Sequence, residues 1–258
     1  MKQLLYLLLF CSCVVMAQEQ KYILLDSLTA HYQVKQYTLD TSPYGTKNSI
    51  EVYNVFSKKY ETDKGEDFIL LFSVLPDIDS KTNWEKIDFN KIKDNLFPTK
   101  EIFRRIMHKA LGFYLDKNRD ISKTKLVKII KGEYYVSKYC WIEDFYCINN
   151  PFSVPVATKS FIINTNQTIT PIGVLRESFM KLFPLCDDFP FEITSDFSYA
   201  IPEFFENTYL SNIEEKGGNI IYHFYQFSNH LHTNITRFAY IKDKGIVGGI
   251  YLKYFIKG

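Results

Sequence analysis

The sequence lacks the short motifs by which common catalytic families are identified. Its 258 residues contain no G-x-S-x-G, no H-E-x-x-H, no Walker loop and no G-x-G-x-x-G. Many hydrolases have no motif that is legible in one sequence, so this absence does not by itself exclude catalysis. The sequence leans toward a protein without enzymatic activity or cofactor. It leaves an exported hydrolase, using a carboxylate with His230 or His232, as the alternative.

Charge of one sign and long apolar runs are also scarce. The chain has 31 basic and 29 acidic residues, so it offers no broad positive surface for nucleic acid. Mean hydropathy is −0.15, and only one long apolar run occurs, at the N-terminus. This composition excludes a bundle of membrane helices, and we expect no transmembrane span in the mature chain.

The N-terminal apolar run has the pattern of an export signal. Lys2 supplies a positive charge, Leu4–Met16 is almost entirely apolar, and the small residue Ala17 precedes polar Gln18. The pattern predicts cleavage between Ala17 and Gln18 and a mature protein that is periplasmic, envelope-associated or secreted. In the alternative, a lipid attached to Cys13 anchors the protein.

Glycine and proline are sparse and scattered, with 11 and 9 residues, and neither a flexible linker nor an internal repeat is visible. Hydrophobic residues make up 46% of the chain, which is enough to build a sizeable core. We therefore expect a signal peptide at 1–17 and one globular domain at 18–258.

Segments rich in β-branched and aromatic residues, bounded by turn-forming residues, predict strands. The predicted strands are Tyr32–Tyr37, Ile50–Phe56, Phe68–Leu75, Lys125–Ile142 with a turn at Lys131–Gly132, and Phe161–Asn164, followed by a C-terminal meander of Ile220–Phe227, Thr233–Lys242 and Ile246–Ile256. The tripeptide Asp243–Lys244–Gly245 fits a hairpin turn with glycine in the left-handed conformation.

Apolar residues at helical spacing predict helices in the middle of the chain. One follows a cap at Asp88, a second covers Ile102–Leu111, and a third begins at Thr170–Pro171 and ends before Pro184. Strands at both ends with helices between them predict an α+β fold. Its mostly antiparallel sheet includes a C-terminal β-meander, and two or three helices pack on it.

Three cysteines remain after the predicted signal, at positions 140, 147 and 186. Export makes disulfides chemically possible, but an odd number leaves at least one thiol unpaired or bonded to another chain. Proximity in the sequence predicts a disulfide between Cys140 and Cys147, with Cys186 buried and free. The alternative is three unpaired buried thiols.

An aromatic segment is the most suggestive candidate binding site. Tyr135, Tyr139 and Trp141 have the spacing that places side chains on one face of a continuous strand. Exposed flat rings can stack on sugars, whereas rings covered by a neighbouring layer only fill the core. We expect these rings to share one face, which a helix mostly covers, and a glycan site if they are exposed.

Metal-binding patterns are incomplete. His230 and His232 could face the same way on a strand, but no third ligand is identifiable. Asp116, Asn118 and Asp120 resemble part of a calcium loop that lacks its glycine and its last glutamate. We therefore predict no metal site. The sequence favours an exported, non-catalytic protein that binds a protein or glycan partner in the envelope or outside the cell, with an inhibitor or immunity-type protein as a further alternative.

Overall fold

The computed structural model describes residues 20–39, 49–57, 67–76, 82–103, 124–148, 161–171, 173, 177, 208–226 and 235–251. Strands account for 64% of the described residues and helices for only 15%. The described part of the chain contains three sheets and one α-helix, α2 (Leu25–His31). The predicted α+β fold with two or three packed helices is therefore wrong, because the described residues form three sheets with a single α-helix packed among them.

The three sheets, called A, B and C below, contain thirteen strands. Sheet A has the order β1 (Tyr22–Leu24), β6 (Lys125–Ile130), β7 (Glu133–Ser137) and β5 (Trp84–Ile87). Sheet B has the order β2 (Gln33–Leu39), β3 (Ile50–Phe56), β4 (Asp67–Leu75), β8 (Tyr139–Ile148) and β9 (Phe161–Asn164). Sheet C is a meander of β10 (Thr208–Lys216), β11 (Asn219–Gln226), β12 (Ile235–Ile241) and β13 (Gly245–Tyr251).

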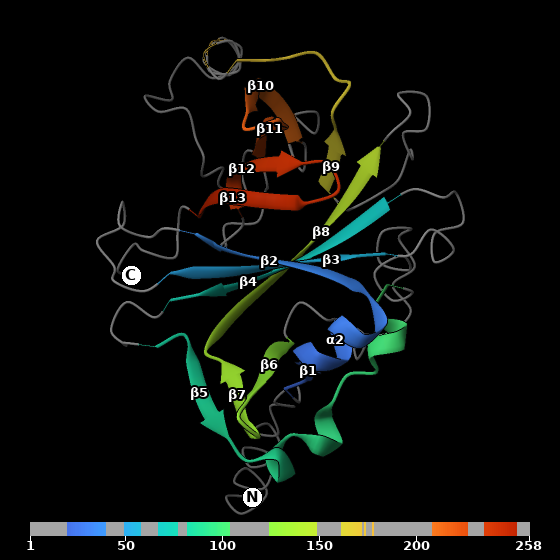
Figure 1. The fold of residues 1–258 in the computed structure, drawn as a ribbon, viewed down its shortest axis with the longest axis vertical. Coiled ribbons are helices and arrows are strands. Elements are labelled where there is room, and N and C mark those ends of the chain that lie inside the picture. Colours follow the sequence, from blue (N-terminus) through green and yellow to red (C-terminus); the bar gives the residue numbers. More distant parts are fainter. Residues whose placement is uncertain are drawn as a thin grey trace, which may run out of the picture.

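Sheet B lies between sheets A and C (Figure 1). Its strand β4 is apolar at almost every position, because residues of alternate parity enter two different cores. Phe72 and Val74 are buried toward sheet A, whereas Ile69 and Leu71 are buried toward sheet C. The parallel pairs β1–β6 and β8–β9 are exceptions in otherwise antiparallel sheets.

The first core fills the space between sheet B, sheet A and helix α2. Leu28 of the helix and Leu126 of β6 are fully buried against Phe72 of β4. The ring of Tyr32 packs edge-on against Phe103, with centroids 4.9 Å apart, and its hydroxyl donates to the carbonyl of Thr99. These contacts attach the N-terminal segment to the segment before β6.

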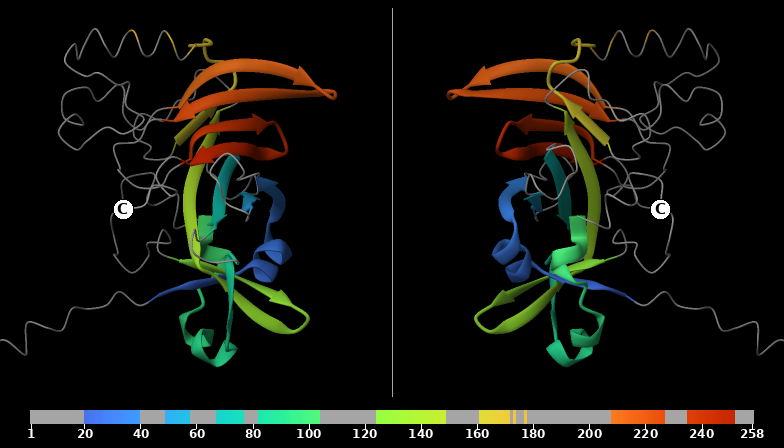
Figure 2. Two further views of the ribbon diagram at one scale, coloured as in Figure 1. Left: turned by 90° about the vertical axis from the view of Figure 1, so that its left-hand side faces the viewer. Right: turned by 90° about the vertical axis from the view of Figure 1, so that its right-hand side faces the viewer.

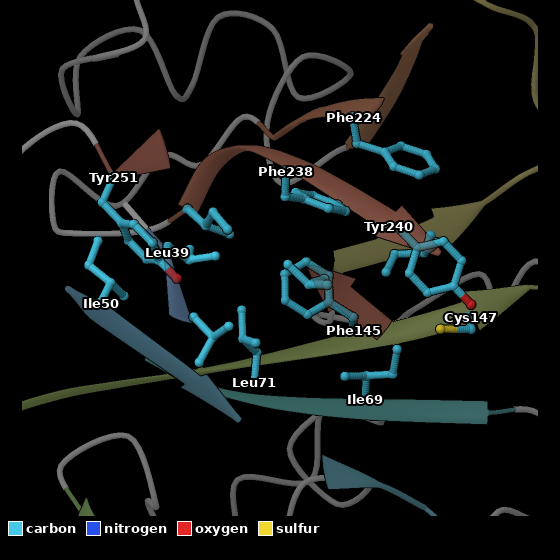
Figure 3. Packing of buried hydrophobic residues seen from close by; sticks show 14 of the residues in the cluster. Leu39, Ile50, Ile69, Leu71, Phe145, Cys147, Phe224, Phe238, Tyr240 and Tyr251 are labelled. Carbon is cyan, nitrogen blue, oxygen red and sulfur yellow. The ribbon is translucent and has the colours of Figure 1, made fainter. Parts of the chain in front are cut away.

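The second core lies between sheets B and C (Figure 3). Phe145 of β8 packs edge-on against Phe238 of β12, with centroids 5.3 Å apart. Phe238 in turn stacks on Phe224 of β11 at 5.2 Å. Tyr251 is fully buried in the same core, and its hydroxyl shares a 2.6 Å hydrogen bond with Ser73 of β4.

The structure contains the predicted hairpin turn and the predicted helix cap. The C-terminal meander is confirmed, and Gly245 has the predicted left-handed conformation, with φ +83. Asp88 does cap a helix, since its side chain accepts from the amide of Asn90. The capped segment is 3-10, however: η3 (Phe89–Lys91) and η4 (Lys93–Asn95) are followed by η5 (Thr99–Glu101).

The other two predicted helices lie mostly outside the described residues. Of the helix predicted at Ile102–Leu111, only Ile102 and Phe103 are described, and both are buried. Of the helix predicted after Thr170, only the first residues are described without a gap. These two predictions remain open.

Candidate functional site

The three aromatic residues predicted to form one face are divided between two sheets. The strand breaks at Lys138, whose amide donates to the carbonyl of Asn83 at 2.9 Å. Tyr135 precedes the break on β7 of sheet A, whereas Tyr139 and Trp141 follow it on β8 of sheet B. The predicted shared face is therefore wrong, because the alternation of side chains does not continue across the break.

The rings also differ in their surroundings. Tyr135 packs partly buried against the core between sheets A and B, and Trp141 against the core between sheets B and C. Tyr139 is 44% exposed. Together they form neither a glycan-stacking shelf nor the helix-covered face that the sequence predicts.

The two cysteines of β8 are free thiols, so the predicted disulfide is wrong. Cys147 is buried in the core between sheets B and C, and Cys140 is half-buried against the core on the other face. Seven residues of one extended strand separate them by roughly 20 Å, whereas a disulfide needs Cα atoms within about 7 Å. Burial raises the pKa of the Cys140 thiol to about 12.

Several candidates from the sequence lie outside the described residues. These are Cys13, Ala17 and Gln18 of the signal region, Asp116, Asn118 and Asp120 of the acidic loop, Cys186, and His230 and His232. In the part of the chain that the structure describes, no group of three or more His, Cys, Asp and Glu side chains could hold a metal ion. His223 instead lies 3.2 Å from the carboxylate of Glu214 on the neighbouring strand.

A carboxylate between sheets A and B collects three donors. Oε1 of Glu51 accepts from the indole N–H of Trp84 at 2.6 Å, and Oε2 accepts from the hydroxyl of Tyr53 at 2.5 Å. The ammonium group of Lys128 lies 3.3 Å from Oε2 and 3.9 Å from the centroid of the Trp84 ring. Burial, then the hydrogen bond to Glu51, raises the pKa of Tyr53 above its ordinary value. Both carboxylate oxygens are thus occupied, which suits a tie between two sheets better than proton transfer.

A second carboxylate is buried between sheets B and C. Glu143 of β8 is only 6% exposed; it accepts from the side-chain amide of Gln226 at 3.0 Å and from the backbone amide of Ile235 at 3.4 Å. Desolvation outweighs these bonds and raises the pKa of Glu143 to about 8. With that pKa the carboxyl group holds a proton at neutral pH, and both of its described donors, Gln226 and Ile235, are buried.

The side chain of Asn54 joins sheet B to β13 of sheet C. Its amide donates to the carbonyl of Ile246 at 2.8 Å, and its Oδ1 accepts from the amide of the same residue at 2.7 Å. The fully buried side chain thus imitates a neighbouring strand. Gly245 lies directly against it, since a Cβ there would be 2.5 Å from Oδ1.

Two hairpins project on the side of the molecule where β2 lies (Figure 2). One is β6–β7, whose turn is Lys131–Gly132, and the other is β10–β11, whose turn is Gly217–Gly218. Four exposed isoleucines lie near their ends: Ile129, Ile130, Ile213 and Ile220, with exposed fractions of 37%, 43%, 41% and 51%. These four residues are called the hairpin surface below.

Sequence reasoning missed Glu51, Asn54 and Glu143. Glu143 had a detectable signal, because it occupies the same parity as Phe145 and Cys147 in a strand of apolar residues. Glu51 gave none, since its partner Lys128 is 77 residues away and the pairing of sheets A and B is not legible in the chain.

No described helix is long and apolar enough to cross a membrane. Comparisons of the chain with protein-family models, with curated proteins and with solved structures found no match.

Proposed function

We propose that this chain is an exported, non-catalytic protein that acts by binding a protein partner through the hairpin surface. The observation that carries the proposal is the exposure of Ile129, Ile130, Ile213 and Ile220 at the ends of two hairpins on one side of the molecule. Apolar area exposed to water costs free energy in proportion to its size, and a partner that covers these side chains removes that cost.

The character of the surface favours a protein over a glycan. Sugar recognition uses flat aromatic rings, and the three rings considered for that role do not share a face. Branched aliphatic side chains instead complement the apolar side chains of another protein. The hairpin surface extends from Ile213 on β10 to Tyr222, which is the direct cross-strand neighbour of Ile213 on β11.

Two carboxylates that lie between sheets, Glu51 and Glu143, do not fit the hydrolase alternative. The partly exposed pair of Glu214 and His223, whose side chains lie 3.2 Å apart, has instead the residue types that this alternative requires. Glu51 binds donors of three strands, and Glu143 is enclosed between two sheets. Neither leaves an exposed oxygen beside a histidine, which a carboxylate–histidine hydrolase requires. If the partner is itself an enzyme, the proposed function takes the form of an inhibitor or immunity-type protein.

The experiment is cross-linking in cells that express the protein, followed by identification of the cross-linked partner. The double variant Ile213→Ser, Ile220→Ser is compared with wild type. Ile169→Ser is the matched control, because Ile169 is 45% exposed but lies beside the start of β10, at the end of that strand opposite the turn Gly217–Gly218. We expect one protein partner that the double variant loses and the control keeps. Equal cross-linking of all three proteins would contradict the proposal.

A further inference from the structure

The edge strand β2 presents hydrogen-bonding groups in a defined pattern. At the end of β3 the amide of Ser57 donates to the carbonyl of Phe68, so odd-numbered residues of β3 bond to β4. Even-numbered residues of β3 therefore bond to β2, where they pair with Gln33, Lys35, Tyr37 and Leu39. It follows that Val34, Gln36 and Thr38 direct both their N–H and C=O groups away from sheet B.

No described residue pairs with these outward groups. Among the described residues, no hydrogen bond reaches the backbone of Val34, Gln36 or Thr38 on the side opposite β3. The side chains of Gln36 and Thr38 are exposed, and no described element stands in front of β2 in Figure 1. Three residues thus offer three donors and three acceptors to solvent.

The other edges, apart from β5, each make at least one described hydrogen bond to a neighbouring segment. Asn54 bonds to Ile246 on β13, and the amide of Thr170 donates to Leu210 on β10. On β1, the carbonyl of Tyr22 accepts from Phe97, and on β9 the carbonyl of Ile162 accepts from Thr208.

The short edge β5 carries Glu85 and Lys86, charged residues that discourage pairing. By contrast, β2 is seven residues long and has one charged side chain, Lys35. Within the described ranges, no such bond reaches the outward backbone groups of β2, and the strand carries little charge.

We propose that β2 binds an extended segment of the partner protein as an additional antiparallel strand of sheet B. The proposal rests on the proposed function and names the form of the partner. Backbone donors and acceptors alternating along a strand are matched by another polypeptide in extended conformation and by no other class of ligand. Because the only charged residue of β2 is basic, we expect an acidic residue opposite Lys35.

The shape of the molecule selects a segment rather than a second copy. In Figure 2 the hairpins β6–β7 and β10–β11 both extend past β2 on its open side. If two copies paired through β2, the hairpins of each copy would project toward the other copy. A single extended chain fits between the hairpins.

The test uses Gln36→Pro, which removes one outward N–H without removing a bond to β3. Proline is tolerated on an edge strand where its missing N–H faces solvent. Gln36→Thr is the matched control, because it changes the side chain but keeps the backbone donor. The probe is a phage-displayed library of random peptides of about ten residues, the upper end of ordinary strand lengths.

We expect wild type and Gln36→Thr to enrich the same peptides, and Gln36→Pro to bind them at least about tenfold more weakly, the effect of one lost hydrogen bond at the interface. Hydrogen exchange of wild type should show fast exchange at Val34, Gln36 and Thr38, which slows when an enriched peptide is added. This second measurement decides the matter if Gln36→Pro does not fold.

Three results would overturn the proposal. They are the absence of enriched peptides, equal binding of those peptides to Gln36→Pro, and protection of the three amides in the free protein, which would show a segment of this chain on β2. If sedimentation shows a dimer of the protein that Gln36→Pro abolishes, β2 pairs with a second copy of the chain and not with a partner segment, which also overturns the proposal. The proposed function and this inference can fail separately. If no partner is cross-linked in cells but the double variant Ile213→Ser, Ile220→Ser still binds the enriched peptides, the proposed function fails and the binding of a strand to β2 stands.

Discussion

Glu143 makes stability fall as the pH rises through neutrality. Burial raises its pKa from 4.5 to about 8 in the folded protein, so the folded state binds a proton that the unfolded state has already released. The favourable contribution is complete below about pH 4.5 and is lost as the pH approaches about 8. At 1.36 kcal/mol per unit, the shift corresponds to a loss of at most about 5 kcal/mol.

Glu143→Gln should change the shape of this pH profile. A neutral amide still accepts from Gln226, but its NH2 group faces the amide of Ile235, which is also a donor. We therefore expect the variant to be less stable than wild type by about 1–3 kcal/mol near pH 5, where one buried donor lacks an acceptor. Above about pH 8 the order should reverse, because wild type then buries a charge between two sheets.

The assay is urea unfolding followed by the fluorescence of Trp84 and Trp141, at pH values from about 4.5 to about 9, on either side of the raised pKa. Glu215→Gln serves as control, because Glu215 is exposed on β10. The stability curves of wild type and Glu143→Gln should cross, whereas that of Glu215→Gln should run parallel to wild type. Parallel curves for all three proteins would refute the reasoning about burial.

Three further predictions concern contacts within the fold. Asn54→Ala should lower the free energy of unfolding, measured by urea titration, by about 2–5 kcal/mol, because it leaves two buried backbone groups of Ile246 without partners. A loss below about 1 kcal/mol would show that water replaces the side-chain amide. Gly245→Ala should lower the free energy of unfolding by about 1–3 kcal/mol, because residue 245 has a φ of +83 and a Cβ there would contact Oδ1 of Asn54. The loss should be smaller in the Asn54→Ala background, which a double-mutant cycle measures. Full additivity of the two substitutions would contradict the contact. Iodoacetamide should leave the thiols of Cys140 and Cys147 unmodified until the protein unfolds, which mass analysis of the labelled peptides would show. A pair of peptides joined by a disulfide would contradict the free thiols.

Local chemistry allowed several elements to be predicted from the sequence. The turn at Gly245, the cap at Asp88 and the strands of the meander depend on neighbouring residues, and the structure contains all of them. The turn Lys131–Gly132 after β6 likewise has left-handed residues, at φ 52 and φ 81. Predictions of this kind need only the backbone preferences of a few adjacent residues.

Features that depend on distant pairing could not be predicted in the same way. The apolar run of β4 is compatible with one buried face or two, and only the presence of both sheets A and C decides between them. The alternation from Tyr135 to Trp141 continues in the sequence but not in space, because the strand changes sheets at Lys138. The open edge of β2 was likewise invisible, since it is defined by the strands that do not pair with it.

The order of strands along the chain decides which parts of this molecule can exist separately. Sheets A and B are interleaved: β1 precedes β2–β4, β5–β7 follow, and the chain then returns to sheet B with β8 and β9. No continuous stretch before residue 165 therefore contains one of these two sheets whole without strands of the other. Sheet C occupies one continuous segment from β10 to β13, so recombination could exchange it as a block. The exchanged block would have to bring its own complement to Phe145, Asn54, Ser73 and Glu143, which are among the side chains of sheet B that contact sheet C in this structure.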